Sequence, residues 1–250
     1  MENKYTTLWI KDFNQDNVKA YHQKFYSSYL KNIKHRQQIS FIKKFVKDDM
    51  YWCDCPIGSG RIFDEIRTSK IIGVDISDEF IRYNTNRGIN CIKADLFDLQ
   101  FKNEFDFVTC LHTISGLEDS KMVIKNLIDS LKSGGILIID IKNKANVLLN
   151  NKKFRKYEWG DGMSRSEIVD FFKLNKCHIL SIKCHDYYDN IPFTNWIRTG
   201  SPIVRKLKRI QMKVINILYF RLFLYWLFNL WEKTRKEEEF AKYLIAVKKR

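Results

Sequence analysis

The feature that most constrains the fold is an alternation that begins at residue 51, where short apolar runs are separated by longer amphipathic stretches. The runs have the length of strands and predict strands at about residues 50–55, 71–75, 90–94, 105–111, 135–141, 177–184 and 240–247. The intervening stretches predict helices at about residues 60–68, 78–87, 120–132 and 164–174. Strands that alternate with helices favour a parallel, doubly wound α/β sheet with helices on both faces. The carboxyl ends of the parallel strands then meet at one edge, where ligands bind.

The N-terminal part has a different pattern. Apolar and aromatic residues recur at near-helical spacing over residues 14–47, which predicts helix with a break near Lys34 and His35. We therefore expect an N-terminal helical cap over residues 1–49, followed by the α/β domain over residues 50–250.

A glycine-rich turn follows the first predicted strand. The strand ends in DCPIGSGR, which holds Asp54, Pro56, Gly58 and Gly60. A turn of this kind between a strand and a helix lets the backbone approach a ligand closely and directs free N–H groups at it. Alone the turn is a weak signal, because many turns contain two glycines at this spacing.

Carboxylates end the next two strands. Asp75 ends IIGVD, and a carboxylate about 20 residues after the turn can accept both hydroxyls of an adenosine ribose. Its charge also argues against a 2′-phosphate at that position. Asp95 ends CIKAD and could accept from an adenine amino group, while Leu96 covers the ring. Asp54 and Asp95 could instead serve only as helix caps.

The order of five segments carries a family resemblance. DCPIGSGR, IIGVD, CIKADLFD, FDFVTCLH and LKSGGILIID, within residues 50–142, together resemble the class I S-adenosylmethionine-dependent methyltransferases. The similarity is to the small-molecule branch related to quinone-biosynthesis methyltransferases. It implies a Rossmann-like, mostly parallel seven-stranded sheet with an antiparallel last strand. The family's pattern is D-x-G-x-G-x-G, and here Pro56 replaces the first glycine, which removes an N–H and fixes φ.

The resemblance implies S-adenosylmethionine as the cofactor. It assigns the cofactor contacts to Asp54, Pro56, Gly58, Gly60, Asp75, Ile76, Asp95, Leu96 and Leu111. A dinucleotide-dependent dehydrogenase is the main rival on the same fold, but it would need hydride-transfer residues in a second domain, and the sequence shows no such domain.

His112 is the candidate catalytic residue, because it follows the fourth strand at the expected mouth of the site. A general base is needed only if the methyl acceptor must lose a proton, and His112 could also be a wall residue. Candidate substrate contacts are Tyr26, His185, Tyr187 and Tyr188, for which core packing is the alternative interpretation. No metal site is expected, since the cysteines lack zinc-ligand spacing.

By elimination and resemblance, the favoured reaction is O-methylation of a small-molecule, sugar or lipid-linked glycan acceptor, as in polysaccharide biosynthesis. The chain lacks the N/D-P-P-Y/F run of amino methylation and the Pro-Cys pair of cytosine methylation. An RNA methyltransferase and a non-catalytic S-adenosylmethionine-binding protein stay open as alternatives. The reduced-looking cysteines and the absence of a signal-peptide core favour a cytoplasmic, possible membrane-associated location.

A basic and aromatic segment over residues 186–237 interrupts the alternation and predicts a helical insertion before the last strand. Residues 141–250 carry 24 Lys or Arg against 10 Asp or Glu, which indicates an anionic partner or a solvated surface. Residues 214–231 are apolar nearly all round, although Arg221 near the centre argues against a membrane span. Peripheral membrane contact through residues 198–231, a lid and a homodimer contact all fit, whereas nucleic acid is the less favoured partner.

Overall fold

The fold is given by a computed structural model, which describes residues 15–27, 29–66, 70–117, 119–150, 162–185, 225–227 and 229–250. Seven strands form one sheet in the order β3-β2-β1-β4-β5-β7-β6. The strands are β1 (Trp52–Asp54), β2 (Ile71–Asp75), β3 (Asn90–Lys93), β4 (Phe105–Cys110), β5 (Leu131–Lys142), β6 (Cys177–His185) and β7 (Lys242–Lys249). The helices are α2 (Gln15–Ser27), α3 (Tyr29–Ile42), α4 (Arg61–Glu65), α5 (Asp78–Thr85), α6 (Ser120–Ser130), α7 (Lys144–Asn150) and α8 (Arg165–Leu174).

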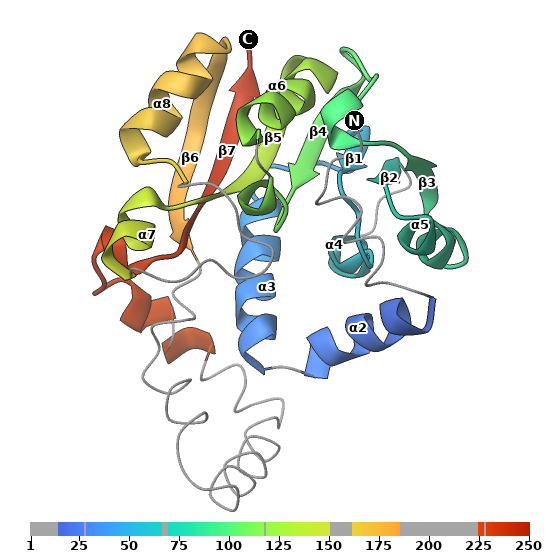
Figure 1. Cartoon of the computed structure of the whole chain (residues 1–250), viewed down its shortest axis with the longest axis horizontal. Helices are drawn as coiled ribbons and strands as arrows, with labels where there is room; N and C mark the ends of the chain where they lie inside the picture. The colour runs from blue at the N-terminus through green and yellow to red at the C-terminus, as the bar shows by residue number, and fades with distance from the viewer. Residues whose placement is uncertain are drawn as a thin grey trace, which may run out of the picture.

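The pairing confirms the expected doubly wound sheet with an antiparallel last strand. The pairs among β1 to β5 are parallel, whereas β7 runs antiparallel to both β5 and β6. Figure 1 shows β7 pointing the opposite way from β4 and β6. The strand β7 therefore sits between two strands that both precede it in the sequence.

The strand β5 begins earlier than expected. Leu131 pairs with Phe105, and the register then shifts before Phe107 pairs with Ile136. Gly134, with φ of 81°, lies within this irregular stretch, a backbone conformation that glycine adopts without steric penalty. Residues 131–134, which precede the predicted strand at 135–141, are thus part of β5, because Leu131 already pairs with β4.

The sheet separates two apolar layers. Alternate residues such as Trp52, Phe107 and Ile138 pack in one buried cluster with α3 and α4 residues, because successive strand side chains point to opposite faces. Their neighbours, such as Val108 and Ile139, pack in a second cluster that contains α6 and α8 residues. Each inner strand is thereby buried on both faces, which is the condition for a stable parallel sheet.

The predicted break near Lys34 and His35 is wrong, because α3 runs through both residues. His35 is 4% exposed and Ile39 is 6% exposed, so this stretch of α3 is held by burial against the sheet. The N-terminal helical segment instead divides between Ser27 and Tyr29. Figure 1 shows α2 and α3 at the end of the sheet toward which β4 points, which is the edge where ligands bind in such folds.

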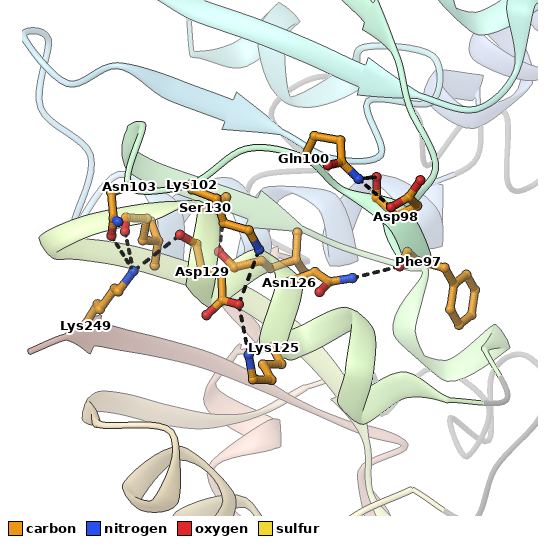
Figure 2. A network of polar contacts seen from close by, with 12 residues as sticks. Phe97, Asp98, Gln100, Lys102, Asn103, Lys125, Asn126, Asp129, Ser130 and Lys249 are labelled. Carbon is orange, nitrogen blue, oxygen red and sulfur yellow. Dashed lines mark hydrogen bonds and ion pairs between the residues drawn. The ribbon is translucent and has the colours of Figure 1, made fainter.

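A polar network closes the opposite edge (Figure 2). Lys249 near the end of β7 donates from Nζ to the Oδ1 atom of Asn103, at 2.9 Å, and to the backbone oxygens of Asp129 and Leu131. These carbonyls lie at the end of α6, where a cation offsets the negative pole of the helix. The contact ties the last strand to the β3–β4 and α6–β5 connections, away from the ligand edge.

The described part of the insertion is short. A helical stretch over residues 225–232, apart from residue 228, precedes β7, while residues 186–224 lie outside the described residues. The predicted basic cluster and most of the apolar run therefore fall outside the described part. In the part of the chain that can be examined, no helix combines the length and apolar character that a membrane span needs.

Candidate active site

The glycine-rich turn between β1 and α4 has two residues in the left-handed region. Gly58 has φ of 52° and Gly60 has φ of 69°, a region that favours glycine. A side chain at Gly60 would collide with Asn84, whereas a Cβ at Gly58 would meet no atom within 4 Å. The turn is therefore closed toward α5 and open at Gly58, on the side from which a ligand can approach the backbone.

Two side chains hold the backbone of the turn, one from α5 and one from just after this helix. Asn84 is fully buried and donates from Nδ2 to the backbone oxygen of Gly58 at 2.7 Å. Arg87 donates from Nη1 to the backbone oxygen of Ser59 at 2.8 Å and pairs with Asp64 of α4. With its carbonyls held in this way, the turn has its orientation fixed before any ligand arrives. The sequence patterns did not identify Asn84 or Arg87, since an Asn and an Arg on an amphipathic helix look like ordinary surface residues.

Asp75 closes the turn from the second strand. Its Oδ2 atom accepts the Gly58 N–H at 2.9 Å, and its Oδ1 atom accepts the Ser77 N–H at 3.0 Å. Burial raises the pKa of Asp75 to about 6, against the opposing effect of the backbone hydrogen bonds. Each carboxylate oxygen has a second lone pair, so Asp75 keeps acceptor capacity for ribose hydroxyls.

Asp54 at the end of β1 belongs to a buried relay. Thr109 of β4 donates from Oγ1 to the Oδ1 atom of Asp54 at 2.6 Å and accepts from the Trp52 indole at 2.9 Å. Burial raises the pKa of Asp54 to about 7, while the hydrogen bond from Thr109 and the charge of Arg61 act in the other direction. Asp54 does not cap α4, because Gly60 is the N-cap residue of that helix and no side chain caps it.

Asp95 at the end of β3 does act as a cap, which was the alternative considered for it. Its Oδ1 atom accepts the Phe97 N–H at 2.9 Å at the start of the short helix η1 (Leu96–Asp98). Leu96 is half-buried against the core, and Asn126 donates to its backbone oxygen at 3.0 Å. The Oδ2 atom of Asp95 is not used by the cap, so the cap and a ligand contact are compatible.

The residues of the turn fit the cofactor implied by the resemblance. The open space in front of Gly58 can admit a ligand, and Asp75 retains free acceptor positions. Within the described residues, the buried Ser59 hydroxyl has no hydrogen-bond partner, and a buried hydroxyl in that state is costly unless a ligand or water meets it. The predicted contacts Pro56 and Ile76 are half-buried beside these groups, as expected of residues that line a turn.

His112 follows β4 and Leu111, which is 8% exposed. Its φ is 62°, and its N–H donates to the Oδ1 atom of Asp140 in β5 at 2.8 Å. The imidazole Nδ1 atom lies 3.6 Å from the Asp140 Oδ2 atom, and the side chain keeps 28% exposure. One carboxylate therefore faces both the backbone and the ring of His112, a geometry that orients an imidazole.

Asp140 is fully buried and pairs with Lys242, whose Nζ atom lies 3.0 Å from its Oδ2 atom. The other ring nitrogen of His112, Nε2, lies 3.0 Å from the Oε1 atom of Gln38 in α3. Asp140, Lys242 and Gln38 were not identified from the sequence. Asp140 did carry a signal, because a carboxylate inside the apolar run ILIID needs a partner when it is buried.

The predicted substrate contacts are only partly placed. His185 ends β6 fully buried and pairs in register with Lys242 of β7. Tyr26 belongs to α2, but the position of its side chain lies outside the described residues, as do Tyr187 and Tyr188 altogether. The structure thus brings His185 to the correct sheet edge, and its role as a substrate contact stays a prediction.

The sequence match to a known family falls in the part of the chain that holds the glycine-rich turn and the first five strands. Residues 53–139 match the family model described as a methyltransferase domain. An uncharacterized protein of Methanocaldococcus jannaschii is 32% identical over 123 residues, a match that spans 47% of this chain and 59% of that protein. The family match ends within β5, and the chain spans little more than half of the length of this relative.

Two solved structures share the fold at low identity. Magnesium protoporphyrin IX methyltransferase of Synechocystis, solved with S-adenosylhomocysteine bound, has a TM-score of 0.60 at 12% identity and covers 98% of this chain and 99% of its own. An S-adenosylmethionine-dependent methyltransferase of Thermotoga maritima has a TM-score of 0.52 at 22% identity and covers 68% of this chain and 80% of its own. Residues 53–139 are thus similar to a methyltransferase domain, and the two solved structures show that the chain shares the Rossmann-like fold of S-adenosylmethionine-dependent methyltransferases.

Proposed function

We propose that the chain binds S-adenosylmethionine at the glycine-rich turn and transfers its methyl group to an oxygen of a small-molecule, sugar or lipid-linked glycan acceptor. His112 is the proposed general base. The cofactor contacts are those assigned above, and acceptor recognition is placed in residues 1–49 and 186–237, outside the family match.

One observation carries the proposal. The Thr109 hydroxyl donates to Asp54 at 2.6 Å, and the same chain three residues later presents His112. The cofactor turn on β1 and the candidate base after β4 are therefore joined by neighbouring, directly paired strands. A transfer whose leaving group is already activated depends mainly on the alignment of donor and acceptor, and a base beside the donor serves an acceptor that must lose a proton.

S-adenosylmethionine supplies an electrophilic methyl group, and the chain supplies positioning and proton removal. A hydroxyl acceptor becomes a better nucleophile as it loses its proton, which His112 can take. The buried carboxylate of Asp140 faces the ring and stabilises the positive charge that then develops on it. This pairing favours a hydroxyl acceptor over one that needs no proton removal.

The basic C-terminal part favours RNA as a second acceptor class. In the described residues, however, several of these cations already have carboxylate partners. Examples are Lys144 with Glu167, Arg165 with Glu237, and Lys242 with Asp140. The RNA alternative predicts that acceptor binding weakens steeply with salt, whereas a neutral sugar acceptor predicts little change.

Calorimetric titration with S-adenosylmethionine tests the cofactor half of the proposal. Asp75→Ala removes the acceptor of two backbone N–H groups and of the ribose, so the affinity should fall roughly tenfold to a hundredfold, the equivalent of about 1.5–3 kcal/mol. Asp78→Ala is the matched control, because this exposed carboxylate pairs only with Lys93 in the described part of the chain. Equal affinities of the wild type and Asp75→Ala would refute the proposal.

The acceptor half is tested by S-adenosylhomocysteine formation with separate pools of free sugars, lipid-linked glycans and RNA. Activity with the sugar or glycan pool, lost in His112→Asn while cofactor affinity is kept, is the expected result. Activity with RNA alone would replace the acceptor class, and binding without turnover on any pool would favour the non-catalytic alternative.

A further inference from the structure

Gln38 of α3 is placed against the candidate base in a way that the proposed function does not use. It is 1% exposed, and its amide oxygen lies 3.0 Å from the Nε2 atom of His112. Within the described residues, its amide nitrogen has no hydrogen-bond partner. A buried donor without an acceptor costs free energy, so the orientation of this amide needs an explanation.

The charge on the other side of the ring favours a proton on Nδ1. A carboxylate oxygen can only accept, and the Oδ2 atom of Asp140 is the group that faces Nδ1 of His112, at 3.6 Å. The proton of a neutral imidazole therefore belongs on Nδ1, which leaves a lone pair on Nε2. An acceptor oxygen from Gln38 opposite that lone pair would be repulsive.

Burial lowers the pKa of His112 well below its usual range, and the nearby charges of Lys34, Lys242, Arg61 and His185 act in the same direction. This direction favours the neutral form of the ring in the resting protein. The Asp140 carboxylate faces the His112 ring and acts to raise its pKa, but the positive charge of Lys242 offsets part of this effect.

A half-turn of the Gln38 amide resolves the mismatch. The two ends of a glutamine amide have nearly the same shape, so their assignment follows from hydrogen bonding. After the half-turn the N–H group donates to Nε2 of His112, and the buried donor is satisfied. The oxygen then takes the unpartnered place, which costs less, because an unmet acceptor is better tolerated than an unmet donor.

We propose that Gln38 is a positioning residue for the transfer reaction, because its amide donates to Nε2 of His112 and thereby holds the ring as the Nδ1–H form. The assignment of the proton stands on Gln38, His112 and Asp140 alone, and its use in methyl transfer rests on the proposed function. The basic nitrogen then points toward α3, and an acceptor hydroxyl takes the place of the Gln38 N–H group.

The two orientations of the amide match the two states of the base. As the acceptor oxygen forms its bond to the methyl carbon, the carbon–sulfur bond breaks, its electron pair stays on sulfur, and the hydroxyl proton passes to Nε2. The ring then carries a proton on each nitrogen, and Asp140 faces the proton on Nδ1. Once the methylated product has left, the Gln38 oxygen can accept the proton on Nε2 after a half-turn. A single side chain thus donates to the neutral ring and accepts from the charged one.

The neighbouring residue holds α3 in place for this task. Gln37 donates from Nε2 to the Oε2 atom of Glu232 at 2.6 Å and to the Oδ1 atom of Asn229 at 3.0 Å. The helical stretch 225–232 thereby fixes one side of α3, while Gln38 faces His112. A lost contact at Gln38 is for this reason not compensated by a shift of the helix.

Nitrogen-15 NMR of histidine-labelled protein tests the inference, with the His112 signals assigned from His112→Asn. The expected wild-type spectrum at pH 7 shows a proton on Nδ1 and a bare Nε2. In Gln38→Glu a carboxylate faces Nε2, so the ring should gain a second proton, with the pKa of His112 raised by about one unit or more. Gln100→Glu is the matched control, because Gln100 is exposed and donates to Asp98 instead of His112 (Figure 2), so it should leave His112 unchanged.

A wild-type ring with its proton on Nε2, or one that is fully charged at pH 7, would overturn the inference without any variant being needed. An unchanged His112 signal in a folded Gln38→Glu would do the same. Cofactor titration on the same samples keeps the two proposals apart. Failure to bind S-adenosylmethionine would remove the proposed function, while the wild-type spectrum would still decide the role of Gln38.

Discussion

The two halves of the ligand edge are built in different ways. At the ends of β2 and β3, carboxylates accept backbone N–H groups that are near in sequence, as Asp75 does from Ser77 and Asp95 does from Phe97. At the ends of β4, β5 and β7, side chains contact partners far along the chain, as His112 does with Gln38 and Asp140 does with Lys242. The cofactor half thus depends on local backbone geometry, and the acceptor half depends on the completed fold.

The largest effect that this comparison predicts is on stability. Asp140→Ala leaves Lys242 buried without its carboxylate and removes the acceptor of the His112 N–H, so the free energy of unfolding should fall by about 3–5 kcal/mol. Denaturant unfolding measures it. The control Asp129→Ala removes a partly exposed partner of Lys125 and should cost less than about 1 kcal/mol. Equal losses in the two variants would contradict the contrast between the halves.

A second variant acts where the halves meet. Thr109→Val leaves the Trp52 indole and Asp54 without a shared hydroxyl, and we expect a loss of about 2–3 kcal/mol in unfolding free energy together with weaker cofactor binding. Thr109→Ser retains the hydroxyl and should stay near the wild type in both measurements. If Thr109→Val unfolds like Thr109→Ser, the relay does not join the two halves.

The support behind the glycine turn should have a moderate effect. Asn84→Ala frees the backbone oxygen of Gly58, and cofactor affinity should fall roughly tenfold, the equivalent of about 1.4 kcal/mol. Asn175→Ala is the matched control, since its amide also donates to a helix carbonyl four residues earlier but far along the chain from the turn. Calorimetry that gave both variants the wild-type affinity would show that α5 does not set the turn.

The burial of Asp54 also predicts a pH dependence of stability. The pKa of Asp54 is raised from 3.8 to about 7 by burial, so the folded state holds this proton over a range where the unfolded chain has lost it. Stability should therefore fall as the pH rises from about 4 to about 7, by at most about 1.4 kcal/mol per pH unit. Asp54→Asn should flatten the curve in this window, and parallel curves for the two proteins would rule the contribution out.

The fold could be predicted from the sequence because it leaves local patterns, and the candidate cofactor residues at the strand ends were predicted from patterns of the same kind. Alternating strands and helices are visible as periodicity, and Asp54, Gly58 and Asp75 stand at fixed positions around strand ends. The break expected near Lys34 was wrong because burial against the sheet overrides local pattern. The boundary of β5 was displaced by a register shift that only pairing with β4 reveals.

The acceptor half could be predicted only in part. His112 was identified because it follows a strand end, whereas Gln38, Asp140 and Lys242 gain their roles from contacts between elements distant in the sequence. No local pattern distinguishes Gln38 from Gln37 on α3, although one faces the base and the other faces the stretch 225–232. A carboxylate inside an apolar strand, such as Asp140, therefore predicts a buried partner from a distant part of the sequence.

The position of β7 between β5 and β6 also governs how the protein can be made. During synthesis β6 emerges from the ribosome before β7, the strand with which it pairs. Until β7 has been translated, β6 and α8 therefore lie beside an incomplete sheet. The unpaired edge of β5 is open over the same interval, and such edges invite wrong partners. Folding of this chain on the ribosome should therefore proceed in two stages, with α3 and β1 to β5 assembled first and β7 inserted last between its two waiting neighbours.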